Sequence, residues 1–338
     1  MVRESTILAA DIGGTKTYAG IFVLEQGRLR PTLVRRLLNT DFESIEDLLS
    51  HFINEAGGLD KLNVAHAALG VAGPVEGNRC CLTNTSWAID GEVIRRLLGV
   101  AGVTLLNDLA ATGWSIDALE GQDIRVINAG VKKEGNAALI AAGTGLGESI
   151  LFNCENKIRP LATEGGHTDF APRTELEMEL LAHLMERFGH VSYERVLSGD
   201  GLGNIYTFLL EKAGEALTET ERQVFDNHGG GEIVFKEAHD KDNPVAREAL
   251  RIFASVYGAE AGNLALKSLS IGGLYIGGGI APKVFGDSEA KTFMESFVQK
   301  GRFREMLSSM PVYLIKNDKA GLLGAAKYAS YFLLEKRK

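Results

Sequence analysis

Residues 9–17 read Ala-Ala-Asp-Ile-Gly-Gly-Thr-Lys-Thr, a glycine turn between two apolar runs. The runs, residues 7–10 before the turn and residues 18–24 after it, predict a strand, a turn and a second strand. Two adjacent glycines carry no Cβ, so backbone N–H groups at this bend can approach an anion closely. Asp11 ends the first strand, where it could hold a hydrated cation. These parts suit a Mg²⁺-bound polyphosphate, and the alternative is a tight hairpin whose glycines serve geometry alone.

Length, charge and composition exclude several classes of function. The 338 residues are enough for two domains with full cores, and the net charge of −8 argues against a nucleic-acid-binding surface. No apolar run reaches the ~18 residues that span a membrane. The first residues lack a signal-peptide pattern, and the three cysteines have no disulfide or zinc spacing. We therefore expect a cytoplasmic protein with no nucleic-acid or membrane partner.

Alternating strands and helices with short connections predict a largely α/β fold. Apolar runs predict strands at residues 7–10, 19–24, 65–71, 103–106, 139–142, 274–276 and 312–315. Helical spacing predicts helices at residues 42–56, 93–98, 174–188, 246–269 and 321–335. Thr174 and Glu177 have the spacing of a capping box. Residues 218–243 are polar and contain three consecutive glycines, which indicates an exposed excursion.

The second half of the chain begins as the first half does. Residues 139–146 read Leu-Ile-Ala-Ala-Gly-Thr-Gly-Leu, and residues 7–14 read Ile-Leu-Ala-Ala-Asp-Ile-Gly-Gly. Each is an apolar strand that ends in Ala-Ala and enters a glycine turn. This short echo suggests two similar halves whose turns could hold one polyphosphate from both sides.

Asn107 and Asp108 end a predicted strand and begin a predicted helix. Ligands of open α/β sheets bind outside the carboxyl ends of strands, and a helix N-terminus favours an ionised carboxylate. Such an aspartate could accept a proton from a hydroxyl that attacks phosphorus. The alternative is that Asp108 is an N-cap with a purely structural role.

Residues 164–167, Glu-Gly-Gly-His, form a second candidate cluster. Glutamate accepts hydrogen bonds and histidine can donate them, which suits paired sugar hydroxyls. A lone histidine is more often structural, and Glu194 could equally be a solvated surface carboxylate. The sequence lacks a P-loop, a GxGxxG fingerprint and a GxSxG elbow.

Together these stretches resemble the bacterial glucokinases, members of the actin-like ATPase and sugar-kinase superfamily, over nearly the whole chain. The motifs that carry the resemblance lie in order along the sequence: residues 10–15 (ADIGGT), 69–74 (LGVAGP), 83–87 (TNTSW), 106–111 (LNDLAA), 142–147 (AGTGLG), 164–172 (EGGHTDFAP), 190–201 (HVSYERVLSGDG), 276–282 (IGGGIAP) and 311–315 with 321–324.

The resemblance implies two actin-like (ribonuclease H-like) α/β lobes with a cleft between them. We expect the small domain at residues 1–118 plus 317–338 and the large domain at residues 119–316. The implied reaction is transfer of a phosphoryl group from ATP to the 6-hydroxyl of glucose, with Mg²⁺, in a homodimer.

The resemblance also implies a role for individual residues. Asp108 would be the general base, and the residues that hold glucose would be Asn107, Asp108, Glu164, His167 and Glu194. Asp11 would hold Mg²⁺ through water. The ATP-binding residues would be Ala10, Asp11, Ile12, Gly13, Gly14, Thr15, Gly143, Thr144, Gly145, Gly277, Gly278 and Gly279.

Two positions depart from the family pattern, and other functions stay open. Lys16 stands where these glucokinases often carry Asn, and residues 218–243 look longer than usual. The cysteine-rich zinc motif of the related repressor branch is missing, so we expect no structural zinc. The alternatives are a kinase for another hexose or an amino sugar, a sugar-sensing binding protein with vestigial ATPase activity, and an actin-like filament protein.

Overall fold

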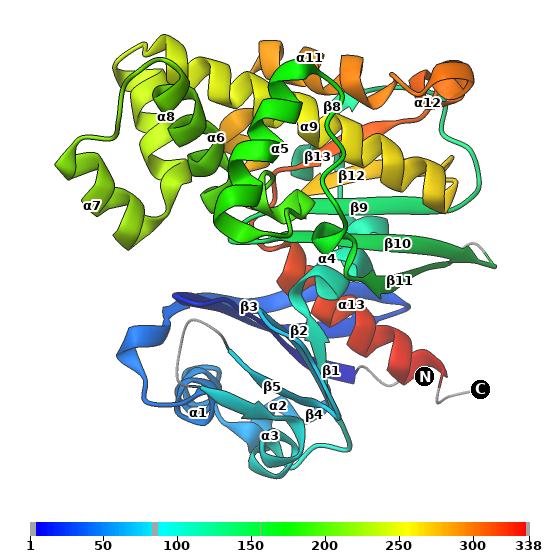
Figure 1. The fold of residues 1–338 in the computed structure, drawn as a ribbon. Helices are drawn as coiled ribbons and strands as arrows, with labels where there is room; N and C mark the ends of the chain where they lie inside the picture. The colour runs from blue at the N-terminus through cyan, green and yellow to red at the C-terminus, as the bar shows by residue number, and fades with distance from the viewer. Residues whose placement is uncertain (1–4, 83–86, 156, 336–338) are drawn as a thin grey trace. The chain divides into compact units, whose positions relative to one another are not determined.

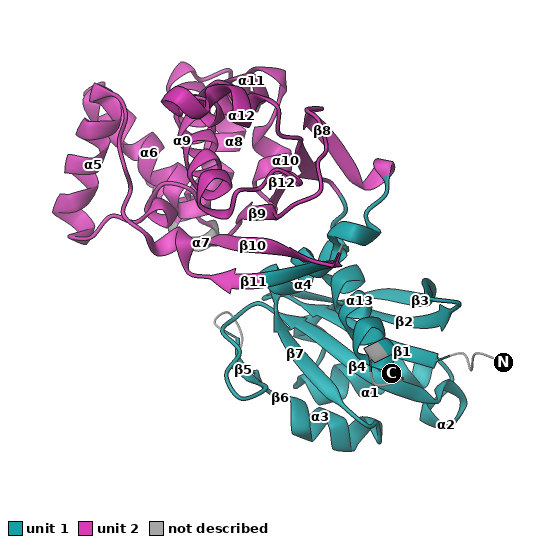
Figure 2. Ribbon diagram, turned by 90° about the vertical axis from the view of Figure 1, so that its right-hand side faces the viewer, with its two compact units in different colours: residues 1–120, 158–160, 317–338 teal, residues 121–157, 161–316 magenta. Residues whose placement is uncertain are grey.

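The computed structural model describes residues 5–82, 87–155 and 157–335 (Figure 1). The chain divides into two compact units: unit 1 comprises residues 1–120, 158–160 and 317–338, and unit 2 comprises residues 121–157 and 161–316 (Figure 2). Residues 83–86 of the TNTSW motif lie outside the described part. Among the described residues, no helix combines the length and apolarity of a bilayer span.

Unit 1 contains a five-stranded sheet in the order β3-β2-β1-β4-β7. β1 (Ser5–Ile12), β2 (Lys16–Glu25) and β3 (Arg28–Leu38) are joined antiparallel. β4 (Val64–Val71) runs parallel to β1, and β7 (Val103–Asn107) runs parallel to β4. The predicted strands of this half are therefore confirmed. The sequence prediction missed β3, an edge strand with few buried side chains, and the short pair β5 (Arg79–Cys81) and β6 (Ala88–Asp90).

Helices cover both faces of the unit 1 sheet. Because side chains alternate along β1, Leu8 and Ala10 face one layer while Ile7 and Ala9 face the other. The first layer contains α1 (Ile45–Glu55) and α3 (Gly91–Leu98), and the second contains α13 (Ala320–Glu335). The last helix thus belongs to the first unit. The remaining helices of this unit are α2 (Leu59–Leu62), α4 (Asp108–Ser115) and the 3₁₀ turns η1 (Asn39–Asp41) and η2 (Ile116–Ala118).

Unit 2 contains a six-stranded sheet in the order β11-β10-β9-β12-β13-β8. β9 (Ala137–Ala142) is antiparallel to β10 (Leu146–Cys154) and parallel to β12 (Gly273–Gly277). β13 (Val312–Ile315) continues the parallel set, with β8 (Ile124–Asn128) antiparallel at one edge and β11 (Lys157–Thr163) at the other. The order β11-β10-β9-β12-β13 repeats the order β3-β2-β1-β4-β7, so the short sequence echo corresponds to a repeated topology.

The core of unit 2 is built on α9 (Pro244–Ser268), whose Phe253 and Tyr257 are fully buried. α5 (Glu175–Phe188), α6 (Gly199–Lys212) and α11 (Asp287–Phe297) contribute to the same core. The other described helices of this unit are α7 (Glu219–His228), α8 (Gly230–Asp240), α10 (Ala281–Val284) and α12 (Arg304–Ser308), with 3₁₀ turns η3 (Gly121–Asp123), η4 (Gly165–His167), η5 (Tyr193–Arg195) and η6 (Gly301–Phe303).

The prediction of an exposed excursion at residues 218–243 is wrong for α8, while the described residues of α7 are exposed or half-buried. The segment forms α7 and α8, and α8 buries Ile233 and Val234 in the core of unit 2. Gly230 is buried because α8 crosses α6 closely: a Cβ on Gly230 would lie 2.3 Å from the Cα of Gly203. The glycines therefore serve helix packing, which a polar, glycine-containing sequence does not reveal.

The predicted capping box at the start of α5 is only half formed. The Thr174 side chain caps the helix by accepting from the N–H of Glu177. The Glu177 carboxylate instead accepts from the backbone N–H of Arg173 at 2.6 Å. A complete capping box occurs at α7, between Thr218 and Glu221.

Candidate active site

Asp11 lies near the end of β1 in unit 1, in a cradle that two glycines leave open. A Cβ on Gly321 would lie 2.6 Å from Asp11 Oδ2, and a Cβ on Gly70 would lie 3.6 Å from Oδ1. Although the side chain keeps some exposure, dense packing around it and the negative charge of Asp108 raise the pKa of Asp11 to about 7; Asp318 adds to this and Lys16 opposes it. The carboxylate thus lies where a bound cation would be stabilised.

The first glycine turn, which follows β1, is held by Asn39. The Gly13 N–H donates to the Lys16 carbonyl at 3.0 Å, and Asn39 Nδ2 donates to the Gly13 carbonyl at 2.8 Å. The Asn39 N–H donates to the Thr15 carbonyl, and Asn39 Oδ1 accepts from Thr17 Oγ1 at 2.9 Å. Sequence reasoning missed Asn39 because it follows β3, the strand that the apolar pattern did not indicate.

Asn107, and not Asp108, is the N-cap of α4. Asn107 Oδ1 accepts from the N–H groups of Leu109 at 3.0 Å and Ala110 at 3.4 Å, and Nδ2 donates to the Gly73 carbonyl at 3.3 Å. The alternative that Asp108 is the cap is therefore wrong. Asp108 is the first residue of the helix and is exposed as a residue, although protein atoms surround its carboxyl group, whose Oδ1 accepts from the Leu109 N–H at 2.8 Å. Dense packing around the carboxyl raises its pKa, and the Leu109 hydrogen bond opposes this shift.

The second glycine turn, residues 143–145, joins β9 to β10 in unit 2. The Gly143 N–H donates to the Gly145 carbonyl at 2.8 Å, and the Gly143 carbonyl accepts from the N–H of Gly199, the first residue of α6, at 2.9 Å. The end of β12 lies beside the turn: Gly278 has a φ of +83°, and a Cβ there would lie 2.1 Å from the Ala142 carbonyl oxygen. Two of the predicted nucleotide-binding segments, residues 143–145 and 277–279, are therefore neighbours.

Glu164, His167 and Glu194 converge in unit 2. His167 Nε2 lies 4.0 Å from a Glu164 oxygen, and its Nδ1 lies 4.0 Å from Glu194 Oε1. The three side chains are 90%, 59% and 29% exposed, so a small polar molecule can reach all of them. The structure thus brings together three of the predicted sugar-binding residues from two separate sequence motifs.

The glycines of residues 164–167 allow this loop to lie directly on β10. A Cβ on Gly166 would lie 2.1 Å from the Leu146 carbonyl oxygen, and a Cβ on Gly165 would lie 2.1 Å from Glu148 Oε2. The Tyr193 N–H donates to the Thr168 carbonyl at 3.0 Å, which ties the loop to the segment that carries Glu194.

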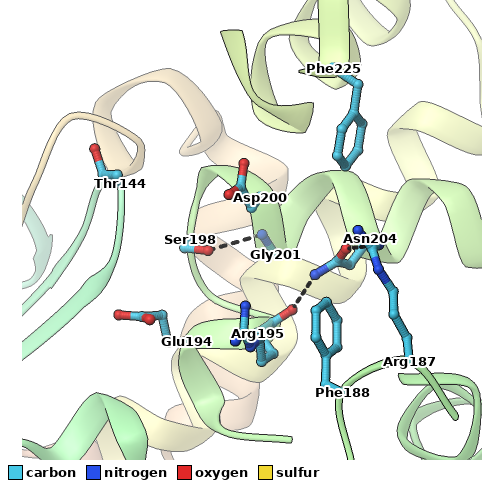
Figure 3. A pocket seen from close by; sticks show the side chains of 10 residues that line it. All are labelled: Thr144, Arg187, Phe188, Glu194, Arg195, Ser198, Asp200, Gly201, Asn204 and Phe225. Atoms are coloured by element: carbon cyan, nitrogen blue, oxygen red, sulfur yellow. Dashed lines mark hydrogen bonds between the residues drawn. The ribbon is translucent and has the colours of Figure 1, made fainter. Parts of the chain in front are cut away.

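A cavity of about 120 Å³ lies beside the second glycine turn (Figure 3). Figure 3 shows Thr144 and Glu194 at one side of it, and Arg187 and Phe188 at the other. The Arg195 guanidinium lies 4.3 Å from the centre of the Phe188 ring, and the Arg187 guanidinium lies 4.8 Å from the same ring. Sequence reasoning assigned no role to either arginine, since neither belongs to a nucleotide-binding pattern by itself.

Solved structures of sugar kinases share the fold. The glucokinase from an Antarctic psychrotroph matches with a TM-score of 0.83 and 28% identity, covering 97% of this chain and 99% of that one. A ROK family glucokinase from Streptomyces griseus in complex with glucose and AMPPNP matches with a TM-score of 0.60 and 22% identity, covering 97% and 100%. The chain therefore has the two-lobe actin-like architecture of the sugar kinases.

The sequence comparisons are more specific. The glucokinase family model matches residues 8–331. The glucokinase of Nostoc sp. is 38% identical over 341 residues, which cover 96% of this chain and 98% of the relative. The chain belongs to the glucokinase family, whose reaction is the ATP-dependent phosphorylation of glucose.

Proposed function

We propose that the chain transfers the γ-phosphoryl group of ATP to the 6-hydroxyl of glucose with Asp108 as the general base. The main observation behind this proposal is that two neighbouring residues at the start of α4 have different roles. Asn107 caps the helix, so Asp108 presents an accessible carboxylate at the carboxyl end of a parallel strand.

The chemical step needs one proton acceptor. The Asp108 carboxylate takes the proton of the 6-hydroxyl while the hydroxyl oxygen forms a bond to the γ-phosphorus. The bond from that phosphorus to the β–γ bridging oxygen breaks, and its electron pair leaves with ADP. The raised pKa of Asp108 makes it a better proton acceptor near neutral pH than an ordinary aspartate.

The sugar is held by the cluster of Glu164, His167 and Glu194. Two carboxylates that flank one imidazole offer acceptors and a donor to neighbouring hydroxyls, and the 4.0 Å separations leave room for hydroxyl oxygens to approach. Asn107 Nδ2 donates to the Gly73 carbonyl at 3.3 Å, and the same side chain is hydrogen-bonded to the Asp108 carboxylate, so Asn107 stands beside the general base, where it can contribute to sugar binding.

ATP is bound by glycine-rich backbone. We expect residues 10–15 and residues 143–145 to bind the phosphates, and residues 277–279 to bind the adenosine. A Cβ on Gly143 or on Gly279 would meet no described atom within 4 Å, so both glycines border open space where a nucleotide could lie against the backbone. Lys16 adds a positive charge beside the first turn.

The surroundings of Asp11 fit Mg²⁺. The described residues contain no cluster of three or more acidic, histidine or cysteine side chains that could hold a metal by themselves. Mg²⁺ typically keeps several waters and binds one or two carboxylates together with substrate phosphates, and the negative charge around Asp11 suits this. The ion would neutralise charge on the transferred phosphoryl group.

The division of the chain and its assembly stay proposals. The two compact units support a small domain at residues 1–118 plus 317–338 and a large domain at residues 119–316. A homodimer, implied by the family resemblance, is tested by sedimentation of the purified protein. A cytoplasmic location, expected from the cysteine usage and the first residues, is tested by cell fractionation.

A coupled assay with MgATP and a panel of sugars tests the sugar and the position of transfer. Glucose should give glucose 6-phosphate at ~1–100 s⁻¹, the usual range for kinases. 6-Deoxyglucose should compete with glucose and accept no phosphate, because it lacks the attacked hydroxyl. Faster turnover on another hexose would move the assignment to that sugar, and phosphorylation of 6-deoxyglucose would contradict transfer to the 6-hydroxyl.

A further inference from the structure

Two buried glutamates form a pair beneath the predicted sugar-binding loop. Glu148 on β10 and Glu260 on α9 are 2% and 0% exposed, and their carboxyl groups face each other within hydrogen-bonding reach. Lys267 Nζ lies 3.4 Å from Glu260 Oε1. Lys267 is in direct contact with the pair, whereas Lys300 reaches Glu260 only through Asn263, so two ionised carboxylates would share one contacting ammonium in the interior, which is unfavourable. A pair that keeps one proton avoids this cost.

The partners of the two carboxyls assign the proton to Glu148. Glu260 is in the ion pair with Lys267, accepts from Asn263 Nδ2 at 2.7 Å, and faces the phenol of Tyr193. Glu148 Oε1 is buried and has no hydrogen-bond partner among the described residues. Burial and the charge of Glu260 raise the pKa of Glu148. Glu148 is therefore the neutral member, which donates to Glu260.

The pair contacts both of the segments that carry the sugar cluster. On one side, Glu148 Oε2 lies so close to Gly165 that a Cβ there would be 2.1 Å away. The Glu148 carbonyl accepts from Thr163 Oγ1 at 2.8 Å, and Thr163 Oγ1 accepts from the Gly165 N–H at 3.2 Å. On the other side, Glu260 contacts Tyr193, the residue before Glu194.

We propose that Glu148 is a positioning residue for the sugar: through its shared proton with Glu260 it holds residues 164–167 and Tyr193 in the arrangement that binds glucose hydroxyls. The inference rests on the proposed sugar roles of Glu164, His167 and Glu194. When the pair loses its proton, two carboxylates repel each other against Gly165. The loop is then displaced, and the KM for glucose rises while Glu148 itself never touches the sugar.

Several other titratable groups face this pair, so a variant of Glu148 is needed to assign a pH effect on the KM for glucose to Glu148. Glu148 faces Glu260, Lys267 and Tyr257 of α9. Glu260 also faces Tyr193 of η5 and, through Asn263, Lys300, whose pKa burial lowers; Arg173 adds to that lowering. A pH effect that disappears in a variant of Glu148 belongs to Glu148 and to none of these groups.

The test measures the KM for glucose and for ATP from about pH 6.5 to about pH 9.5 in wild type, Glu148→Gln and Glu148→Ala. In wild type the KM for glucose should rise about tenfold across this range as the pair loses its proton. Gln donates without titrating, so Glu148→Gln should keep the neutral-pH KM within about threefold and show a flat profile. Glu148→Ala should raise the KM about tenfold at every pH, and the KM for ATP should change less in each case.

Glu237→Gln is the matched control, because Glu237 is a buried glutamate of α8 that pairs with Lys241. It should keep the wild-type pH profile. A flat wild-type profile, or a Glu148→Gln enzyme with the wild-type pH dependence, would overturn the inference. Glu164→Gln distinguishes failure of the proposed sugar site from failure of the positioning role of Glu148. An unchanged KM for glucose in Glu164→Gln would contradict both. A raised KM would support the sugar site, and the Glu148 variants would then decide the positioning role.

Discussion

Glu194 Oε2 accepts a hydrogen bond from the backbone N–H of Leu146 at 3.0 Å. Leu146 directly follows the second glycine turn, and a Cβ on Gly145 of that turn would lie 2.5 Å from the same oxygen. The other Glu194 oxygen faces His167 at 4.0 Å. One carboxylate group thus connects the predicted phosphate-binding turn with the predicted sugar cluster.

Replacement of Glu194 should affect both substrates. Glu194→Ala should raise the KM for glucose by about 10- to 100-fold, because a hydroxyl partner is lost, and the KM for ATP severalfold, because the turn loses its anchor. Glu194→Gln keeps an oxygen that can accept from Leu146, so it should raise the KM for glucose alone. Two-substrate kinetics measure this. Glu164→Ala, at the other carboxylate of the sugar cluster, is the control and should raise the KM for glucose alone. If Glu194→Ala also changed only the KM for glucose, the proposed connection between the glycine turn and the sugar cluster would be contradicted.

A methyl group at Gly321 should disturb Asp11. Because the new Cβ would lie 2.6 Å from Asp11 Oδ2, Gly321→Ala should displace the carboxylate and raise the Mg²⁺ concentration for half-maximal activity by about tenfold. A titration of activity against Mg²⁺ at fixed ATP measures it. Gly121→Ala is the matched control, since its Cβ meets no described atom within 4 Å. An unchanged Mg²⁺ requirement in Gly321→Ala would argue against the role of Asp11.

The close packing of α6 against α8 should contribute to the free energy of unfolding. In Gly230→Ala the added Cβ would lie 2.3 Å from Gly203 Cα, so the two helices must separate, which costs about 1–3 kcal/mol of unfolding free energy. The KM for ATP should also rise, because the first residue of α6 donates to the Gly143 carbonyl. Urea unfolding and kinetics test both effects. Lys236→Ala, at an exposed site on α8, should change neither; equal stability of Gly230→Ala and wild type would contradict the packing account.

The stability of the protein should fall as the pH rises toward about 8. The pKa of Glu148 is raised from its ordinary value to about 8, so the folded state binds this proton more tightly than the unfolded state does. The stabilisation is complete below the ordinary glutamic acid pKa and is lost as the pH rises through the raised value, at up to about 1.4 kcal/mol per pH unit. Urea unfolding of wild type and Glu148→Gln measures this, and parallel pH profiles of the two proteins would contradict it.

The central strands of both sheets could be predicted from the sequence, because buried parallel strands are continuous apolar runs. β1, β4, β9 and β12 are examples. The edge strands β3, β8 and β11 escaped prediction because none of their residues is fully buried and their apolar pattern is weak. Residues 218–243 were predicted to be exposed because they are polar and contain glycines, but glycine is used there to pack α8 closely against α6.

The candidate site was likewise predictable from local sequence only in part. Asp11, Asp108 and the glycine turns stand at strand ends, and local sequence indicates them. The convergence of His167 with Glu194 depends on the pairing of two distant segments, and only the family resemblance implied it. Asn39 and the pair of Glu148 and Glu260 belong to no motif, because their contacts arise from tertiary packing alone.

The central claim is that Asp108 takes the proton of the sugar hydroxyl, and Asp108→Asn tests it most directly. Asparagine keeps the size of the side chain and cannot accept the proton. Turnover of glucose with MgATP should fall by about 10²- to 10⁴-fold, while calorimetry should show glucose affinity within about threefold of wild type. Turnover near the wild-type rate would contradict the assignment of Asp108 as the general base.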